Sequence, residues 1–322
     1  MKYLVTGAAG FIGMHTSKRL LEEGHEVVGL DNMNSYYDPI LKNYRLSQLT
    51  PYRTFRFIKL DLSDREAIAK LFGVEQFERV IHLAAQAGVR YSINAPFEYV
   101  DSNLVGMMTI LEGCRHNQVQ HLVYASSSSV YGMNEKIPFS ETDQVDYPIS
   151  LYAVTKKANE LMAHAYSKLY NIPTTGLRFF TVYGPAGRPD MAPWLFTQAI
   201  LENQPIKVFN HGKMQRDFTY IDDVVEGIIR VQNIIPKTNI PYSLFNIGNS
   251  KPIELSRFIA AIESATGKVA QKINFGMQAG DVERTFADTK KLEDTINYKP
   301  QMEIEIGVKN FVEWYKNYYN KS

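Results

Sequence analysis

Tyr152 and Lys156, in the string Y-A-V-T-K, are the two residues of this chain whose types and spacing most clearly indicate chemistry. Residues four apart on a helix lie on the same face, one turn from each other. A buried ammonium beside a phenol stabilises the phenolate and lowers the pKa of the tyrosine, which can then take a proton from a hydroxyl near neutral pH. The spacing alone is weak, because it also occurs by chance in many helices.

A run of serines, Ser126 to Ser129, precedes this pair. A serine hydroxyl near the tyrosine can donate a hydrogen bond to the oxygen that reacts. The run could equally supply turn and cap hydrogen bonds at the end of a strand. Because Tyr152 and Lys156 follow it, we assign one of the four serines to catalysis.

A glycine-rich turn, G-A-A-G-F-I-G, follows the first apolar segment and contains Gly7, Gly10 and Gly13. Glycines allow a tight turn and let a pyrophosphate approach the N–H groups at the start of a helix. Asp31 ends the next apolar segment, 18 residues after Gly13. A carboxylate at that place accepts hydrogen bonds from ribose hydroxyls and repels a 2′-phosphate, which predicts NAD rather than NADP.

Short apolar runs alternate with helical patterns through the first half of the chain, which is typical of a parallel sheet covered by helices on both faces. The expected strands are Tyr3–Thr6, Glu26–Asp31, Arg56–Leu60, Arg79–Ala84, Leu122–Ala125, Thr175–Phe180 and Leu244–Ile247. The expected helices are Phe11–Glu23, Arg65–Phe72, Pro96–Asn117, Tyr152–Tyr170, Asp222–Ile235, Ile253–Thr266 and Ile306–Tyr319.

The pattern becomes irregular beyond Tyr183, in a loop rich in Gly and Pro. We therefore expect an α/β fold with a doubly wound parallel sheet (Rossmann) and a smaller, mixed C-terminal substrate lobe. The first domain should span 1–180, with 217–248 returning to it, and should bind NAD. Residues 181–216 and 249–322 should form the nucleotide-sugar lobe, with ligands between the two lobes.

The overall composition excludes several classes of protein. The 35 basic and 34 acidic residues give a net charge of +1, which argues against a nucleic-acid binder. The single cysteine, Cys114, forms no internal disulfide and fits a reducing compartment. No membrane span or targeting segment is visible, so the expected location is the cytoplasm. The histidines show no metal-ligand spacing, and His82 fits a core position better than a catalytic one.

These motifs, together with Leu83–Ala85, resemble the extended short-chain dehydrogenase/reductase superfamily over nearly the whole chain. Three longer strings are similar to the UDP-glucuronate 4-epimerases. They are D-N-M-N-S-Y-Y-D-P-I-L-K at Asp31–Lys42, Q-A-G-V-R-Y-S at Gln86–Ser92, and R-F-F-T-V-Y-G-P-A-G-R-P-D-M at Arg178–Met191.

The resemblance implies roles for individual residues. Ser127 matches the catalytic serine position and joins Tyr152 and Lys156, with Ser129 as the alternative. Besides the glycines, Asp31, Tyr152 and Lys156, the implied NAD-binding residues are Phe11, Ile12, Asn32, Asp61, Leu62, Leu83, Ala84, Ala85, Gln86, Asn103 and Phe180. The implied substrate-binding residues are Gly88, Arg90, Ser127, Thr181, Arg188, Arg216 and Gln278.

Three of these assignments have alternatives. Asp61 could cap a helix, because Asp61–Asp64 is rich in capping side chains. Arg216 could form a surface ion pair with Asp217. Arg90 could pair with a substrate carboxylate or with a surface acid.

The reaction implied is inversion at C4 of a UDP-sugar through a 4-keto intermediate, with NAD regenerated in each cycle. Thr181 and Gln278 stand where hexose epimerases of the superfamily have asparagine and arginine, which favours a uronate substrate. The alternatives are a UDP-hexose 4-epimerase, a UDP-glucuronate decarboxylase and an inactive NAD-sensing scaffold. The superfamily also implies a homodimer formed by the helices Pro96–Asn117 and Tyr152–Tyr170.

Overall fold

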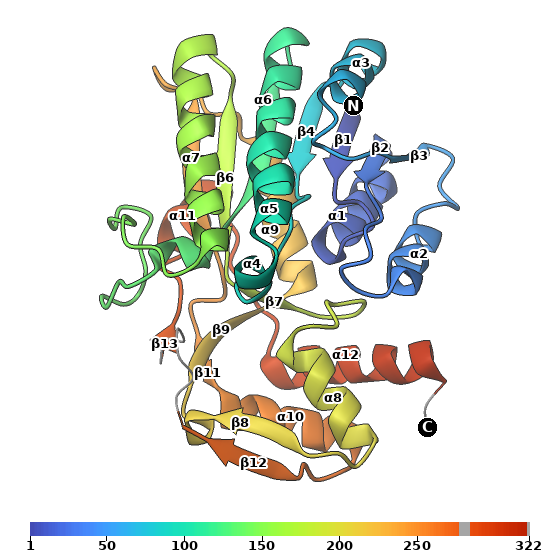
Figure 1. Cartoon of the computed structure of the whole chain (residues 1–322), viewed down its shortest axis with the longest axis vertical. Coiled ribbons are helices and arrows are strands. Elements are labelled where there is room, and N and C mark those ends of the chain that lie inside the picture. The colour runs from blue at the N-terminus through green and yellow to red at the C-terminus, as the bar shows by residue number, and fades with distance from the viewer. Residues whose placement is uncertain (277–283, 321–322) are drawn as a thin grey trace. The chain divides into compact units, whose positions relative to one another are not determined.

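A seven-stranded sheet is the largest sheet of the computed structural model, which describes residues 1–276 and 284–320 (Figure 1). The strand order is β10-β6-β5-β4-β1-β2-β3, and the pairs from β3 to β6 are parallel. The strands are β1 (Lys2–Thr6), β2 (Glu26–Asp31), β3 (Phe55–Lys59), β4 (Arg79–His82), β5 (His121–Ser127), β6 (Thr174–Phe179) and β10 (Tyr242–Ile247). The doubly wound parallel fold predicted from the alternating pattern is confirmed.

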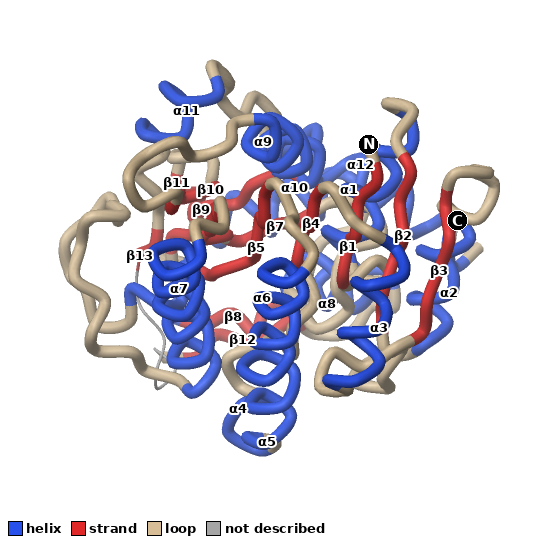
Figure 2. Tube along the Cα trace, turned by 90° about the horizontal axis from the view of Figure 1, so that it is seen from above, coloured by secondary structure: helices blue, strands red, loops and turns tan. Residues whose placement is uncertain are grey.

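Helices cover both faces of this sheet (Figure 2). In the view from above, α3, α6 and α7 lie along one face, and α1 and α9 lie along the other. The helices are α1 (Phe11–Glu22), α2 (Pro39–Ser47), α3 (Arg65–Glu75), α4 (Tyr91–Asn94), α5 (Pro96–Tyr99), α6 (Gly106–His116), α7 (Leu151–Tyr170) and α9 (Ile221–Asn233). From β1 the chain adds β2 and β3 on one side, and then β4, β5 and β6 on the other side of β1. The carboxyl ends of β1 and β4 therefore flank the topological switch point, where ligands of open α/β sheets bind.

The helix expected at Pro96–Asn117 is helical from Pro96 to His116, but it is not a regular α-helix throughout. Its first turn is α5, a π-helical stretch follows at Val100–Val105, and α6 begins only at Gly106. π-Helical turns inside helices frequently mark functional positions, and this one carries Asn103. Periodicity could not reveal the break, because the apolar pattern continues through it.

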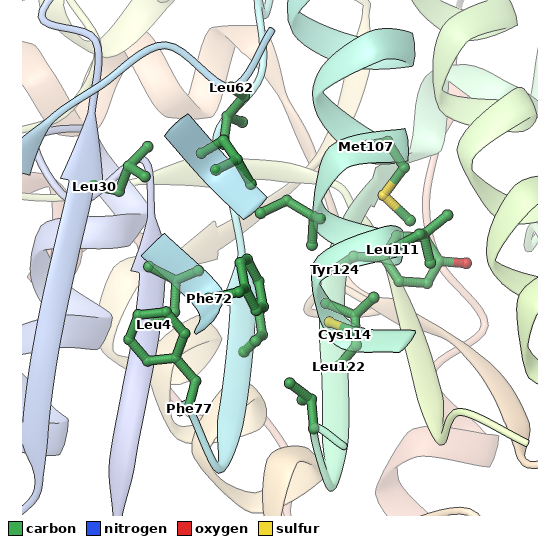
Figure 3. Close-up of a cluster of buried hydrophobic side chains, with 14 of the residues drawn as sticks. Leu4, Leu30, Leu62, Phe72, Phe77, Met107, Leu111, Cys114, Leu122 and Tyr124 are labelled. Carbon is green, nitrogen blue, oxygen red and sulfur yellow. The ribbon is translucent and has the colours of Figure 1, made fainter. Parts of the chain in front are cut away.

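Apolar side chains from β1, β4, β5, α3 and α6 pack into one buried cluster (Figure 3). Phe72 of α3 packs edge-on against Phe77, with 5.4 Å between ring centroids. Gly113 lets α6 approach α3 closely, because a Cβ there would lie 2.6 Å from the Phe72 ring. Cys114 is buried in the same cluster as a free thiol. This core holds the strand ends that carry the candidate site.

The chain forms two compact units. The sheet above belongs to the first unit, which comprises 1–135, 141–179 and 225–246. The second unit comprises 136–140, 180–224 and 247–322. Its elements are β7 (Thr181–Tyr183), α8 (Ala192–Leu201), β8 (Ile206–Phe209), β9 (Gln215–Tyr220), β11 (Pro252–Glu254), α10 (Leu255–Thr266), β12 (Lys272–Phe275), β13 (Arg284–Thr285), α11 (Lys290–Ile296) and α12 (Ile304–Tyr319).

Candidate active site

Tyr152 and Lys156 lie in the first two turns of α7. The helix begins where the side chain of Ser150 accepts a hydrogen bond from the N–H of Ala153. Lys156 is buried, and its Nζ donates to the carbonyl oxygen of Ala125 on β5 at 2.9 Å. Burial lowers the pKa of Lys156 to about 8. The lysine is thus fixed against the end of β5, one helical turn from Tyr152.

The serines at the end of β5 point in alternate directions, as residues of a strand do. Ser127 and Ser129 form a local pair, with 3.1 Å between their hydroxyl oxygens and a further bond from the N–H of Ser129 to Ser127. Ser126 instead donates to Glu160 of α7 at 2.6 Å. The structure therefore engages Ser126 in the protein interior and leaves Ser127 and Ser129 together as the catalytic candidates.

Asn103, in the π-helical stretch, forms hydrogen bonds both with Gln86 and with Thr155 of α7. Its side-chain oxygen accepts from the N–H of Gln86 at 2.8 Å, and its amide donates to the Gln86 carbonyl and to the Thr155 hydroxyl. The Thr155 hydroxyl in turn donates to the carbonyl oxygen of Tyr152. Asn103 is 1% exposed, so the structure places it beneath the site as a link between the Gln86 loop and α7.

The three glycines of the predicted turn stand where a side chain would not fit. Gly7 has φ +72°, and a Cβ there would lie 2.9 Å from the Ala84 nitrogen. At Gly13 it would lie 2.0 Å from the Gly7 carbonyl oxygen. Within the described residues, the N–H groups of Phe11, Ile12 and Gly13 at the start of α1 make no hydrogen bond. This donor set at a helix N-terminus fits a pyrophosphate.

Asp31 ends β2 and Asn32 follows it, beside this turn. Asp31 is 7% exposed and accepts from the N–H of Met33 at 2.8 Å. Lys42 of α2 lies 3.6 Å from Asp31 and donates to Asn34 at 2.8 Å. Burial lowers the pKa of Lys42, although Asp31 acts to raise it. Lys42 was missed from the sequence, because the helix that brings it back to Asp31 was not predicted.

Asp61 does not cap a helix, which corrects one interpretation of this carboxylate. The N-cap of α3 is Asp64, which accepts from the N–H of Ala67 at 3.0 Å. Asp61 accepts instead from Asn32 at 2.8 Å and from Ser63. Burial acts to raise the pKa of Asp61, but these hydrogen bonds hold it below its ordinary value. Asp61 thus ties the end of β3 to the end of β2.

The segment after β4 approaches the glycine turn. The N–H of Ala84 donates to the Thr6 hydroxyl at 3.1 Å, and Thr6 also lies 2.8 Å from His82 Nδ1. Burial lowers the pKa of His82 to about 3, so the ring is neutral at pH 7 and belongs to the core as predicted. Leu83, Ala84 and Ala85 follow, partly exposed, at the same edge of the sheet.

Leu62, Gly88 and Arg90 belong to the first unit, whereas four further predicted site residues, Phe180, Thr181, Arg188 and Arg216, belong to the second. Phe180 is buried, with its ring centroid 6.5 Å from that of Phe139. Thr181 begins β7 opposite Phe218 of β9. Arg188 binds Asp190 through two hydrogen bonds, of 3.0 and 2.6 Å.

Arg216 lies on β9 and donates to the Gln215 carbonyl at 3.0 Å. Its neighbour Asp217 is not part of a surface ion pair. Asp217 is fully buried and accepts from the N–H groups of Asn249, Ser250 and Ala287 at 2.7 to 3.1 Å. Burial raises the pKa of this carboxyl, although the same bonds act against the shift. Asp217 therefore orders the loops around β9.

Three further observations limit the site. Gln278, expected to bind substrate, lies outside the described residues. No group of three or more His, Cys, Asp or Glu side chains in residues 1–276 and 284–320 could hold a metal ion. None of the described helices is long and apolar enough to cross a membrane.

Residues 3–248 match the model of the family described as NAD dependent epimerase/dehydratase. Protein CapI of Staphylococcus aureus is 52% identical over the full length of both chains. A probable UDP-glucuronate 4-epimerase of Rhizobium meliloti is 47% identical over 100% of this chain and 99% of its own. The UDP-glucuronic acid 4-epimerase of Bacillus cereus, solved with UDP-glucuronic acid and NAD, superposes with a TM-score of 0.92 at 36% identity, covering 99% and 100% of the two chains.

Proposed function

Because this chain belongs to the NAD dependent epimerase/dehydratase family, we propose that it inverts C4 of UDP-glucuronate to give UDP-galacturonate. The resemblance to the UDP-glucuronate 4-epimerases is confirmed by relatives of that name at 45 to 47% identity. The enzyme is an NAD-dependent UDP-sugar 4-epimerase. The observation that carries the proposal is that Lys156, one helical turn after Tyr152 on α7, binds the Ala125 carbonyl two residues before Ser127.

C4 of the sugar carries no acidic hydrogen, so inversion requires temporary oxidation. Held by the residues around the glycine turn, NAD would supply the reversible two-electron oxidation of C4 that this requires. Tyr152 takes the proton from O4 and later returns it. Ser127 donates a hydrogen bond to O4 as this oxygen becomes a carbonyl, and the charge of Lys156 stabilises the Tyr152 phenolate. Lys156 is held for this purpose by the Ala125 carbonyl.

The residues around the glycine turn fit NAD. The N–H groups at the start of α1 would bind the pyrophosphate, and Asp31 and Asn32 would bind the adenosine ribose. Asp61 and Leu62 would border the adenine. The other proposed NAD-binding residues are Leu83–Gln86, Asn103 and Phe180. We propose residues 1–180 with 217–248 as the NAD-binding domain, and 181–216 with 249–322 as the nucleotide-sugar lobe. The compact units differ from these bounds, because 136–140, 180, 217–224 and 247–248 belong to the second unit.

The substrate contacts are proposed from position and chemistry. Arg188 and Arg216 are suited to the diphosphate, because guanidinium groups bind phosphate oxygens in a forked geometry. Thr181 would contact the sugar. Gly88 and Arg90 would meet the uronate carboxylate, which must be kept out of line with the C4 carbonyl. A 4-keto uronate that aligns its carboxylate with that carbonyl loses carbon dioxide.

Incubating the purified protein with UDP-glucuronate and, separately, with UDP-glucose tests the proposal. Chromatography of the nucleotide sugars should show UDP-galacturonate from the first and very slow turnover of the second, because a site built for a charged group strongly rejects a substrate that lacks it. Equal rates would identify a hexose epimerase. A predominance of UDP-pentose would identify a decarboxylase, and absence of any product would favour an inactive scaffold.

The selectivity for NAD is tested on the nucleotide that the purified protein retains. Mass spectrometry after denaturation should identify NAD, because Asp31 repels a 2′-phosphate at close range. Lys42, 3.6 Å from Asp31, offsets part of that repulsion. Recovery of NADP as the main species would overturn the role of Asp31.

We propose that the enzyme is a homodimer formed through α6 and α7. A groove of about 860 Å³ runs between α3, α6 and α7, and its lining includes Leu104, Met108 and Met162. Leu161 on α7 is 60% exposed. Light scattering should give twice the chain mass, and Leu161→Glu should halve it. A monomeric wild type would exclude this interface.

We propose the cytoplasm as the location, because a nucleotide-sugar substrate and a buried free thiol suit a reducing compartment. Fractionation of expressing cells, followed by immunoblotting, would test this. Recovery in another fraction would overturn it.

A further inference from the structure

The loop from Gln86 to Arg90 is held by its carbonyl groups. Side chains from the following segment donate to four successive carbonyl oxygens. Asn103 donates to Gln86 at 3.1 Å, Tyr99 to Ala87 at 3.0 Å and to Gly88 at 2.5 Å, and Ser92 to Val89 at 2.6 Å. Two of the four carbonyls therefore share the one hydroxyl hydrogen of Tyr99.

The backbone N–H groups of the same loop differ from its carbonyl groups in their hydrogen bonding. Gly88 has φ +103°, a conformation that L side chains rarely adopt. Among the residues described, the N–H groups of Ala87, Gly88 and Val89 make no hydrogen bond within the chain. The loop thus offers donors, while its acceptors are engaged. Successive N–H groups of this kind attract an anionic oxygen.

Tyr99 also contacts the residue that transfers the proton. It is completely buried, and its ring meets that of Tyr152 edge-on, with 6.1 Å between centroids and 78° between planes. The ring centroid of Tyr91, the first residue of α4, lies 6.2 Å from that of Tyr99. One side chain therefore touches both the amide-presenting loop and the acid/base.

We propose that Tyr99 is a positioning residue that orients the amides of Ala87–Val89 toward the carboxylate of the uronate while it fixes the Tyr152 ring. The proposal rests on the proposed function and specifies how the carboxylate is held. In the 4-keto sugar, loss of carbon dioxide breaks the C5–C6 bond. The electron pair passes through C5 to the C4 carbonyl oxygen, and a proton then adds to C5. Hydrogen bonds from fixed amides oppose this by holding the carboxylate out of alignment.

Tyr99→Phe tests the proposal, because it removes the hydroxyl and keeps the ring against Tyr152. We expect KM for UDP-glucuronate to rise about tenfold and calorimetric affinity for it to fall similarly, the scale of one charge-assisted hydrogen bond. The share of UDP-pentose among the products should increase several-fold. The NAD content and the slow turnover of UDP-glucose should stay at wild-type values. Tyr52→Phe, which removes an exposed hydroxyl bonded to Glu22, is the matched control.

Tyr99→Leu separates the two contacts, because it also removes the ring. We expect it to lower kcat further than Tyr99→Phe. If wild type forms UDP-galacturonate and Tyr99→Phe leaves KM, affinity and the UDP-pentose share unchanged, Tyr99 does not position the loop. Equal losses with UDP-glucuronate and UDP-glucose, or loss of NAD, would show a merely structural role and overturn the proposal. If wild type itself does not turn over UDP-glucuronate, it is the proposed function that fails.

Discussion

Two buried cations on neighbouring elements of the first unit differ in what surrounds them. Lys156 on α7 donates a hydrogen bond to the neutral carbonyl of Ala125, and burial lowers its pKa to about 8. Arg178 on β6 forms two hydrogen bonds of 2.8 Å with the carboxylate of Glu160. Burial acts to lower the pKa of Arg178, but these bonds raise it above its ordinary value.

The difference separates a reactive cation from a structural one. Lys156 can change its charge in an ordinary pH range and lies beside Tyr152. Arg178 is permanently charged and joins β6 to α7 through Glu160, which also accepts from Ser126. Substitutions around Lys156 should therefore affect mainly catalysis, and substitutions around Arg178 and Glu160 should affect mainly the stability of the fold.

Glu160→Ala should produce the largest effect on stability, because it leaves the Arg178 charge buried without its partner. Removing one member of a buried ion pair costs about 3–5 kcal/mol, so the free energy of unfolding should fall by that amount. Urea denaturation followed by circular dichroism measures it. Glu313→Ala, in an exposed pair with Lys309, should leave the midpoint unchanged. A loss below about 1 kcal/mol would remove the structural role from Arg178.

Tyr152→Phe should produce the largest effect on catalysis. Without the hydroxyl, turnover of UDP-glucuronate should fall roughly a hundredfold or more, equivalent to about 2.7 kcal/mol in the barrier. The NAD content and the urea midpoint should remain those of wild type, because the ring still packs against Tyr99. Turnover near the wild-type rate would exclude Tyr152 as the acid/base.

Lys156→Met should stabilise the fold while it removes activity. The folded pKa of about 8 lies below the ordinary value of 10.5, so the unfolded chain binds more protons between these pH values. The free energy of unfolding of wild type should therefore rise with pH across that window. The variant should be roughly 1–3 kcal/mol more stable at pH 7, with the difference shrinking toward pH 10.5. A pH-independent difference would contradict this.

The substitutions Ser126→Ala and Ser127→Ala should show the smallest effects. The first should reduce mainly the stability of the fold, and the second mainly the turnover. Ser126→Ala removes one hydrogen bond to Glu160 and should lower stability by about 1 kcal/mol, with turnover nearly unchanged. Ser127→Ala should lower turnover about tenfold with little change in stability. Urea denaturation and the epimerase assay measure both. The reverse assignment of effects would make Ser126 the catalytic serine.

Local patterns made much of the first unit predictable. A glycine turn between a strand and a helix, an acidic residue after the next strand, and a tyrosine one helical turn before a lysine each depend on a few neighbouring residues. The strands of the sheet were expected for the same reason, since buried parallel strands appear as short apolar runs. The segments α2, α8, β8 and β9 were not expected, because their apolar residues follow no clear period.

The sequence by itself determined the sheet, the NAD turn and the residue types of the reaction, since these follow from local spacing and from side-chain chemistry. Only the tertiary structure decided what each buried polar group meets. It directed Ser126 to Glu160, Asp217 to three backbone amides, Lys42 to Asp31 and Tyr99 to both a loop and Tyr152. Such partners come from segments far apart in the chain or from strand faces that alternate, and the packing of the elements, rather than their spacing, brings them within hydrogen-bonding distance.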